Sequence, residues 1–353
     1  MLAEYSVDYA SARGRFRAAA RAAGARGLAL ALDARGPGDT DLTIDIAWLG
    51  AGRPRRVVLH TSGIHGVEAF HGSAIQLHLL ARPPQLAADS ALVLVHALNP
   101  FGMAWLRRAN ENNVDLNRNF LLPGEAYSGA PDHYAALDPL LNPPSAPGFD
   151  LFLPRVALRI LRHGFQPLKQ AIAGGQYAFP QGLFFGGTRL EQGPALYLDW
   201  LRKHLTGAAY VLALDAHSGL GRFGEQLLIE EPAACATDPA RLGAALGHSI
   251  ATQRSDDAYV VRGGYGAALA HALAGTAVDF VTQEIGTRAP LAIIQALREE
   301  NRAHHHCDGG GIAHPAKRRL LEALNPAAPQ WRAKALSAGV ELVRRAVAFC
   351  NDS

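Results

Sequence analysis

Cysteine is scarce in this sequence of 353 residues. The three cysteines, Cys235, Cys307 and Cys350, are odd in number and far apart along the chain. They therefore form neither a disulfide framework nor a CxxC metal site. A reducing compartment is the simplest setting for such a chain.

A long apolar run is also missing. No stretch reaches the roughly 18 uninterrupted apolar residues that indicate a membrane span. The N-terminal segment places Glu4 and Asp8 where a signal peptide has positive charge, and no apolar segment follows them. We therefore expect a soluble, cytoplasmic protein with no membrane partner.

Charge of either sign is sparse. Charged residues make up 18% of the sequence, the net charge is +3, and the arginines and lysines form no dense block. With aromatic residues at only 7%, the chain lacks the basic and aromatic surface with which proteins bind nucleic acid. The hydrophobic content of 49% is that of a compact globular protein with a sizeable core.

The sequence does have a regular alternation of two kinds of segment. Short runs rich in Val, Ile and Leu predict strands, and apolar residues at helical spacing between them predict helices. No repeat and no linker divides the chain, so the alternation predicts one α/β domain over residues 1–353, with helices on both faces of a sheet. The predicted strands are 42–50, 55–63, 91–100, 208–219, 225–232 and 278–287, and the predicted helices are 10–25, 67–82, 194–205, 238–251, 291–305 and 333–349.

The alternation breaks down between residues 121 and 193. This segment is rich in Pro and Gly and contains one predicted helix, at 152–165. Long connections without regular structure are usually functional loops or insertions. We expect the segment 121–193 either to form a lid or rim over a cleft or to make a homo-oligomer contact, and both alternatives stay open.

The stretch "HTSGIHGVEAFHG" at 60–72 contains three histidines and one glutamate. His65 and Glu68 are three residues apart at a predicted strand-to-helix junction, so both side chains can point into one space. Such a pair can bind one zinc ion through a ring nitrogen and a carboxylate oxygen. The alternative is a histidine near a helix N-terminus beside a glutamate that the helix dipole stabilises. We interpret His60 and His71 as packing residues.

Two other predicted strands end in polar residues. His217 closes "VLALDAHSG" and is a candidate third ligand, and Glu284 closes "DFVTQEIGT". Two histidines and a carboxylate that leave one position open for water are typical of catalytic zinc. A carboxylate beside such a water is a candidate general base.

The segment "RRANENNVDLNRNF" at 107–120 offers further polar groups. Asn117 and the adjacent Arg118 are suited to bind a carboxylate through an amide donor and a bidentate guanidinium. Arg108 is a cation that could stabilise an oxyanion. Each residue alone is equally typical of a solvated turn, and Asp115 in isolation would be a turn residue.

Taken in order, "GIHGVE", "NPFG", "RRANENNVDLNRNF", "DAHSG" and "TQEIGT" resemble the motifs of the zinc carboxypeptidase family typified by carboxypeptidase A. That family includes bacterial branches and is related to the deacylases aspartoacylase and succinylglutamate desuccinylase. Five motifs in one order are far more specific than any one of them. The resemblance implies a central mixed, mostly parallel sheet flanked by helices, one bound zinc ion, and hydrolysis of an amide bond next to a free carboxylate.

The resemblance also implies roles for individual residues. His65, Glu68 and His217 match the zinc ligands of the family. Asp115 matches the aspartate that orients the first histidine, and Arg108 matches the arginine that polarises the scissile carbonyl.

The remaining roles concern the substrate and its proton transfers. Asn117 and Arg118 match the pair that binds the terminal carboxylate, and Glu284 matches the general base and proton shuttle. Tyr259 is at the spacing expected for the mobile tyrosine that closes over the substrate, although Tyr265 competes for that role.

Two substrate classes fit these motifs. The favoured one is a small peptide that loses its C-terminal residue, and the main alternative is an N-acyl amino acid. "HGVE" is nearer to the deacylases, whereas "DLNRNF" and "TQEIGT" are nearer to the carboxypeptidases. A non-catalytic relative that binds carboxylates is disfavoured, because the matched ligands and the matched base are all present.

Overall fold

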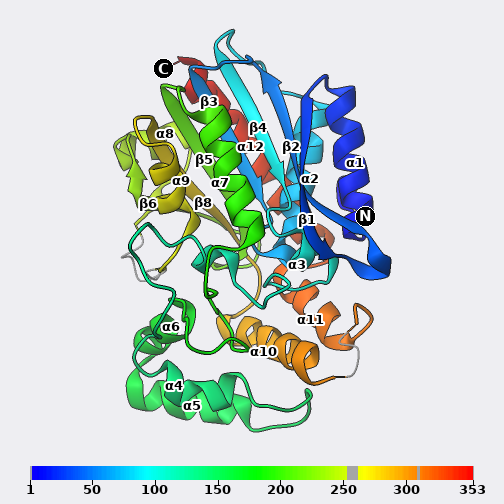
Figure 1. Cartoon of the computed structure of the whole chain (residues 1–353), viewed down its shortest axis with the longest axis vertical. Helices are drawn as coiled ribbons and strands as arrows, with labels where there is room; N and C mark the ends of the chain where they lie inside the picture. Colours follow the sequence, from blue (N-terminus) through cyan, green and yellow to red (C-terminus); the bar gives the residue numbers. More distant parts are fainter. Residues whose placement is uncertain (1, 253–260, 308–310, 353) are drawn as a thin grey trace.

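The computed structural model of the protein describes residues 2–252, 261–307 and 311–352. Its centre is a single sheet with the strand order β1-β2-β4-β3-β5-β8-β6-β7 (Figure 1). The strands are β1 (Arg26–Arg35), β2 (Asp41–Gly50), β3 (Arg56–Ser62), β4 (Ser90–His96), β5 (Tyr210–Gly219), β6 (Gln226–Cys235), β7 (Ile250–Ala251) and β8 (Ala277–Gly286).

The sheet is mixed, with its parallel part in the middle. β4, β3, β5 and β8 run parallel to one another, and β7 runs parallel to β6. The pairs β1 with β2, β2 with β4, and β6 with β8 are antiparallel. Because β3, β5 and β8 are neighbours and parallel, their carboxyl ends meet at one edge of the sheet, where α/β proteins place their sites.

Helices cover both faces of the sheet. Successive residues of β5 point to opposite faces, so Val211 and Ala213 join one apolar cluster while Leu212 and Leu214 join another. The first cluster includes residues of α7 (Gln192–Leu205) and α9 (Tyr265–Ala272), and the second includes residues of α1 (Tyr9–Ala22), α2 (Ala69–Ala81), α8 (Pro239–Leu246) and α12 (Pro329–Asp352).

A further group of elements lies beyond the carboxyl ends of the central strands, in the lower part of Figure 1. This group consists of 3₁₀ turns and helices. The elements are the 3₁₀ turns η2 (Gly66–Glu68) and η3 (Leu116–Arg118) and the helices α3 (Pro100–Ala104), α4 (Tyr134–Leu141), α5 (Phe152–His163), α6 (Phe165–Ala173), α10 (Pro290–His306) and α11 (Pro315–Leu324).

The predicted α/β domain with a mixed sheet is confirmed, and the six predicted strands correspond to β2, β3, β4, β5, β6 and β8. Several elements were missed or predicted with wrong bounds, and the helices α3, α9 and α11 are among those missed. The edge strand β1 was not predicted, although Leu28, Leu30 and Leu32 alternate with other residues as in a strand. The helix predicted for 238–251 ends at Leu246, because Gly247 adopts a left-handed conformation that stops it, and β7 follows.

The segment 121–193 is more regular than predicted. It contains α4, α5 and α6, and only α5 had been predicted. Across the part of the chain that the structure describes, no helix combines the length and the apolar character needed to cross a membrane.

Candidate metal centre and substrate cleft

The candidate ligands His65 and Glu68 leave the sheet together after β3. His65 is the residue before η2, and Glu68 is the last residue of that turn. The turn packs against α3 through two glycines, because a Cβ atom at Gly66 would lie only 2.0 Å from the carbonyl carbon of Gly102. The glycines of "GIHG" and "NPFG" therefore permit a backbone contact that fixes where the two side chains point.

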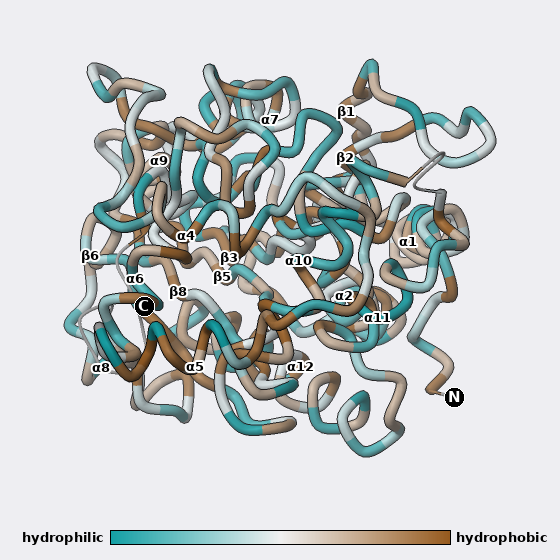
Figure 2. Tube along the Cα trace, turned by 90° about the horizontal axis from the view of Figure 1, so that it is seen from below, coloured by the Kyte–Doolittle hydropathy of each residue, from teal (hydrophilic) through white to brown (hydrophobic). Residues whose placement is uncertain are grey.

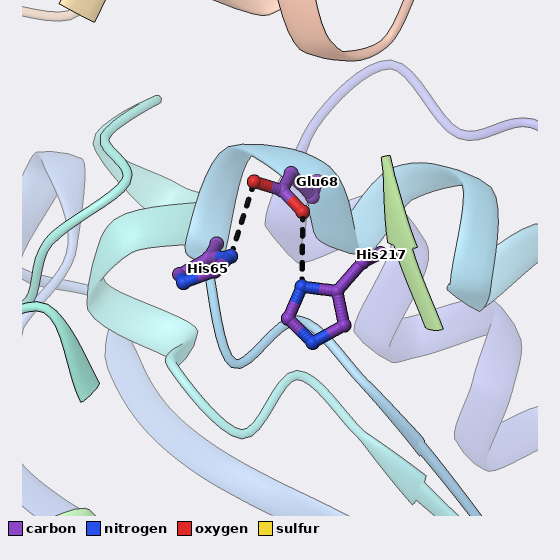
Figure 3. A group of neighbouring side chains, drawn as sticks. All are labelled: His65, Glu68 and His217. Atoms are coloured by element: carbon purple, nitrogen blue, oxygen red, sulfur yellow. Dashed lines mark ion pairs between the residues drawn. The ribbon is translucent and has the colours of Figure 1, made fainter. Parts of the chain in front are cut away.

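His217 joins this pair from the end of β5, and Figure 3 shows the three side chains facing one another. The Nδ1 atom of His65 lies 3.1 Å from Oε1 of Glu68, and the Nδ1 atom of His217 lies 3.5 Å from Oε2 of the same carboxylate. One ligand atom from each residue fits within a span of 4.8 Å. All three side chains are buried, so their polar atoms converge on one enclosed point.

The other nitrogen of each histidine is bound by an aspartate. Nε2 of His65 lies 3.1 Å from Oδ1 of Asp115, and Nε2 of His217 lies 2.7 Å from Oδ2 of Asp215. Metal-binding histidines are held by carboxylates in this way, which leaves the second ring nitrogen for the ion.

The donor atoms of these three residues suit a metal ion. The Nδ1 atom of His65 is buried, and its contact with Oε1 of Glu68 at 3.1 Å lacks the geometry of a hydrogen bond, which is costly unless another partner is supplied. Two imidazole nitrogens and one carboxylate are ligands that zinc accepts, with a fourth position left for water. The three residues therefore could hold one metal ion.

The local electrostatics favour a charged carboxylate at this point. Burial by itself raises the pKa of Glu68, but His65, His217 and Arg108 outweigh burial and hold it well below its usual range. The pKa of Asp115 is likewise held well below its usual range against burial by Arg108, His65 and Arg118. The surrounding charges thus favour the ionised form of both carboxylates.

Glu284 lies beside the cluster, on β8. Its Oε2 atom accepts a hydrogen bond from the backbone N–H of Leu220 at 3.4 Å. Burial raises the pKa of Glu284 to about 7. A carboxyl group with such a pKa can both accept and donate a proton near neutral pH.

Arg108 lies between the cluster and Asp115. Its Nη1 donates to Oε1 of Glu68 at 3.1 Å, and its Nε donates to Oδ2 of Asp115 at 2.9 Å. Its guanidinium carbon also lies 5.3 Å from the ring centre of Phe184. Arg108 therefore lines the same cavity as the candidate ligands.

The two residues predicted to bind a carboxylate are placed differently from each other. Asn117 lines the cleft, and its Oδ1 accepts a hydrogen bond from the backbone N–H of Tyr265 at 3.1 Å. Arg118 is fully buried, and its Nε and Nη2 donate to the carbonyl oxygen of Ala173 at 3.0 and 2.5 Å. Ala173 is the last residue of α6, so Arg118 binds the C-terminal end of a helix of the segment 121–193.

Of the two tyrosines considered as the closing residue, Tyr259 lies outside the described residues. Tyr265 is buried, and its hydroxyl group pairs with the hydroxyl group of Tyr197 at 2.8 Å. This is the position of a core residue whose ring borders the cleft. His60 and His71 also lie in the scaffold, where their Nδ1 atoms face Gln76 Nε2 and the carbonyl oxygen of Glu68.

Two residues at the site were not found from the sequence. Asp215, which binds His217, precedes it by two positions in a strand, and this spacing puts both side chains on one face, so the signal was present. Phe184 has a φ angle of 58°, which is strained for a phenylalanine, and its ring faces both Arg108 and Arg118. No sequence pattern marks such a residue.

A cavity of about 610 Å³ opens onto the cluster. One side of it is formed by residues of β6, β8 and α9, and the other side by α4, α5, α6 and α10. His65, Glu68, His217, Glu284, Arg108 and Asn117 all border this one space, whereas Arg118 does not.

The fold and the site together define the class, which is an α/β domain of the carboxypeptidase type with a candidate metal centre at the carboxyl ends of its central strands. Bovine thrombin-activatable fibrinolysis inhibitor, solved with a tick carboxypeptidase inhibitor, is 12% identical with a TM-score of 0.52, and the match covers 98% of each chain. Carboxypeptidase A from Helicoverpa armigera is 12% identical with a TM-score of 0.51, covering 98% of this chain and 74% of that one.

A model of the family described as "Protein of unknown function (DUF2817)" matches residues 5–338, so the chain belongs to that family. An aspartoacylase family protein from Mesorhizobium loti is 15% identical with a TM-score of 0.40, over 85% of this chain and 67% of that one. No curated protein sequence matches the chain.

Proposed function

We propose that this protein is a zinc-dependent hydrolase that cleaves an amide bond next to a free carboxylate, with His65, Glu68 and His217 as the ligands of one zinc ion. The observation that supports this proposal most is the arrangement of the two histidines. Each presents Nδ1 to Glu68 and has its Nε2 held by an aspartate. Asp115 and Asp215 would fix the tautomer and the orientation of the rings.

Zinc bound there would supply a Lewis acid for the amide carbonyl and would acidify a water molecule. Glu284 would take a proton from the attacking water and pass it to the leaving nitrogen, which its raised pKa suits. Arg108 would stabilise the negative charge that develops on the carbonyl oxygen.

The substrate carboxylate needs a binding site of its own. Asn117 borders the cleft, and Nη1 of Arg118 donates to the carbonyl oxygen of Asn117 at 2.7 Å. We propose that Asn117 contacts the carboxylate and that Arg118 positions Asn117 and adds its charge. Tyr259 is proposed as the residue that closes over the substrate, and the segment 121–193 as the rim of the cleft.

The direct test is to measure the metal content of the purified protein and then its hydrolytic activity. Dipeptides with a free C-terminus and N-acyl amino acids should be assayed with and without a chelator. About one equivalent of zinc and a chelator-sensitive, zinc-restored hydrolysis of either class support the proposal. Hydrolysis that a chelator does not affect, or a protein that binds no zinc, would overturn it.

The second candidate function is deacylation of N-acyl amino acids on the same scaffold. The observation that favours it is the apolar character of the cavity wall that α4, α5, α6 and α10 provide. A peptide has a polar backbone on both sides of the cleaved bond, whereas an acyl chain is apolar on one side.

A further inference from the structure

The cavity wall built by α4, α5, α6 and α10 is almost entirely apolar. Among the described residues, the polar side chains of these four helices that line the cavity are those of Arg159, Gln166 and Lys169. The apolar ones include Leu137, Phe152, Val156, Ile160, Leu168 and Ile294. This wall continues directly from the space bordered by the candidate metal ligands, because both line one cavity.

The apolar wall is a packed structure and is not a loose surface loop. Leu137, Phe152, Val156 and Leu168 are buried in one apolar cluster, against which Ile160 packs. The chamber they form is therefore already shaped before a ligand arrives.

Arginines of α10 hold this wall in place. Arg298 and Arg302 both bind Oδ2 of Asp150, at 2.5 and 3.0 Å, just before α5 begins. Arg298 also donates to the carbonyl oxygen of Leu140 and lies over the ring of Phe152. The helices of the segment 121–193 are thereby tied to the helix that follows the strand of Glu284.

The two ends of the cavity thus differ in kind. One end has the carboxylates, histidines and Arg108, whereas the lining of the other end is mostly apolar. A peptide placed in the apolar end would bring an N–H and a carbonyl group with every residue, and few polar partners are there to satisfy them. A linear hydrocarbon chain has no such groups.

We propose that the acyl group of the substrate is a linear aliphatic chain that lies in this chamber, so that the protein hydrolyses N-fatty-acyl amino acids. This inference rests on the function proposed above and specifies its substrate. Water adds its oxygen to the acyl carbon as the C–N bond breaks, and the leaving nitrogen receives a proton. The products are a fatty acid and a free amino acid.

The test is a series of N-acyl phenylalanines with acetyl, butanoyl, hexanoyl, octanoyl and dodecanoyl groups, assayed with the zinc-loaded protein. Each buried methylene should raise kcat/KM about four-fold until the chamber is full, so the six methylenes between acetyl and octanoyl should raise it by about four thousand-fold. A rate that does not depend on chain length, or a faster rate on apolar peptides than on any acyl chain, would overturn the inference.

Two neighbouring residues of α5 offer a matched pair of variants. Ile160 lines the cavity, whereas Leu161 is 83% exposed and lies outside the lining. Ile160→Asp should lower the ratio of kcat/KM for octanoyl to kcat/KM for acetyl at least ten-fold. Leu161→Asp should leave this ratio unchanged. Equal chain-length dependence in the two variants would contradict the chamber.

Binding gives a readout that does not need turnover. The metal-free protein should bind dodecanoic acid in calorimetry with a Kd at least ten-fold lower than that for hexanoic acid, and Ile160→Asp should remove this difference. If no amide is hydrolysed but this preference is present, the proposed function fails and the chamber stands. If short acyl amides are hydrolysed without a chain-length effect and dodecanoic acid does not bind, the chamber fails and the function stands.

Discussion

His217 and Glu284 are paired directly across the parallel strands β5 and β8. The register of two strands therefore sets the separation between a candidate metal ligand and the candidate base. No loop lies between them, so their relative position is as rigid as the sheet itself.

Replacing Glu284 tests the proton transfer. Glu284→Gln keeps the size of the side chain but removes the group that accepts a proton, so kcat should fall by about 10²- to 10⁴-fold. Zinc content, measured by atomic emission, should stay near that of the unchanged protein because Glu284 is not among the proposed ligands. A variant that retains more than a tenth of the activity would contradict the role of Glu284.

Asp215 gives a prediction about metal affinity. Asp215→Asn replaces the carboxylate that binds His217, so the affinity for zinc should fall about 10- to 100-fold. Competition with a chromogenic chelator measures this Kd. The matched control is Asp45→Asn. Asp45 is a buried carboxylate on β2, away from the site, and it pairs with Arg17 of α1. Equal zinc affinities in the two variants would show that Asp215 does not support the ligand.

A buried ion cluster beside the site gives a prediction about stability. Glu300 lies 2.9 Å from Nε of Arg107 and 2.5 Å from Nζ of Lys317, and all three are buried. Glu300→Gln leaves two buried cations without their anion, so the free energy of unfolding should fall by about 3–5 kcal/mol in urea denaturation.

The control for this prediction is an exposed pair. Arg288 and Glu322 are 2.9 Å apart at side-chain exposures of 46% and 45%. Glu322→Gln should therefore change the free energy of unfolding by about 1 kcal/mol or less. A larger loss in this variant than in Glu300→Gln would contradict the ranking by burial.

His96 should make the free energy of unfolding depend on pH in the acidic range. It is buried against Phe16 and Ser73, and burial, followed by the charges of Arg13 and Arg17, lowers its pKa to about 3. Between about pH 6.5 and 3 the unfolded chain binds a proton at this residue that the folded protein does not bind. Stability from this residue is therefore present above about pH 6.5 and is lost as the pH falls toward 3.

The variant His96→Gln isolates this effect. The free energy of unfolding of the unchanged protein should fall more steeply with acidification than that of the variant, by up to about 1.4 kcal/mol per pH unit. Urea denaturation at several values between pH 4.5 and 7 measures both slopes. Parallel curves would show that His96 takes up a proton in the folded state too.

Much of the fold was predictable because the buried strands have a strong pattern. β3, β4 and β5 are apolar runs covered on both faces, and they could be recognised without knowing their neighbours. β1 is exposed along most of its length, and its alternation of Leu with Ala gave a weaker signal. Short helices such as α4 and α6 are stabilised by their packing on other parts of the segment 121–193, which local sequence does not reveal.

The candidate site could be predicted in its elements and less well in its surroundings. The grouping of His65, Glu68 and His217 follows from strand ends that meet at one edge of the sheet. The contact between Arg118 and Ala173 depends on how a segment 55 residues further along the chain folds back, and no motif near Arg118 encodes it. Long-range contacts of this kind are decided by tertiary packing.

Helix α10 connects the strand that carries Glu284 with the segment 121–193. It starts at Pro290, a few residues after β8 and Glu284, and its Arg298 and Arg302 bind Asp150 in the segment 121–193. The wall of the proposed chamber and the candidate base are therefore held by one continuous helix and the strand before it, so the distance between the two ends of the cavity is fixed by the length of α10.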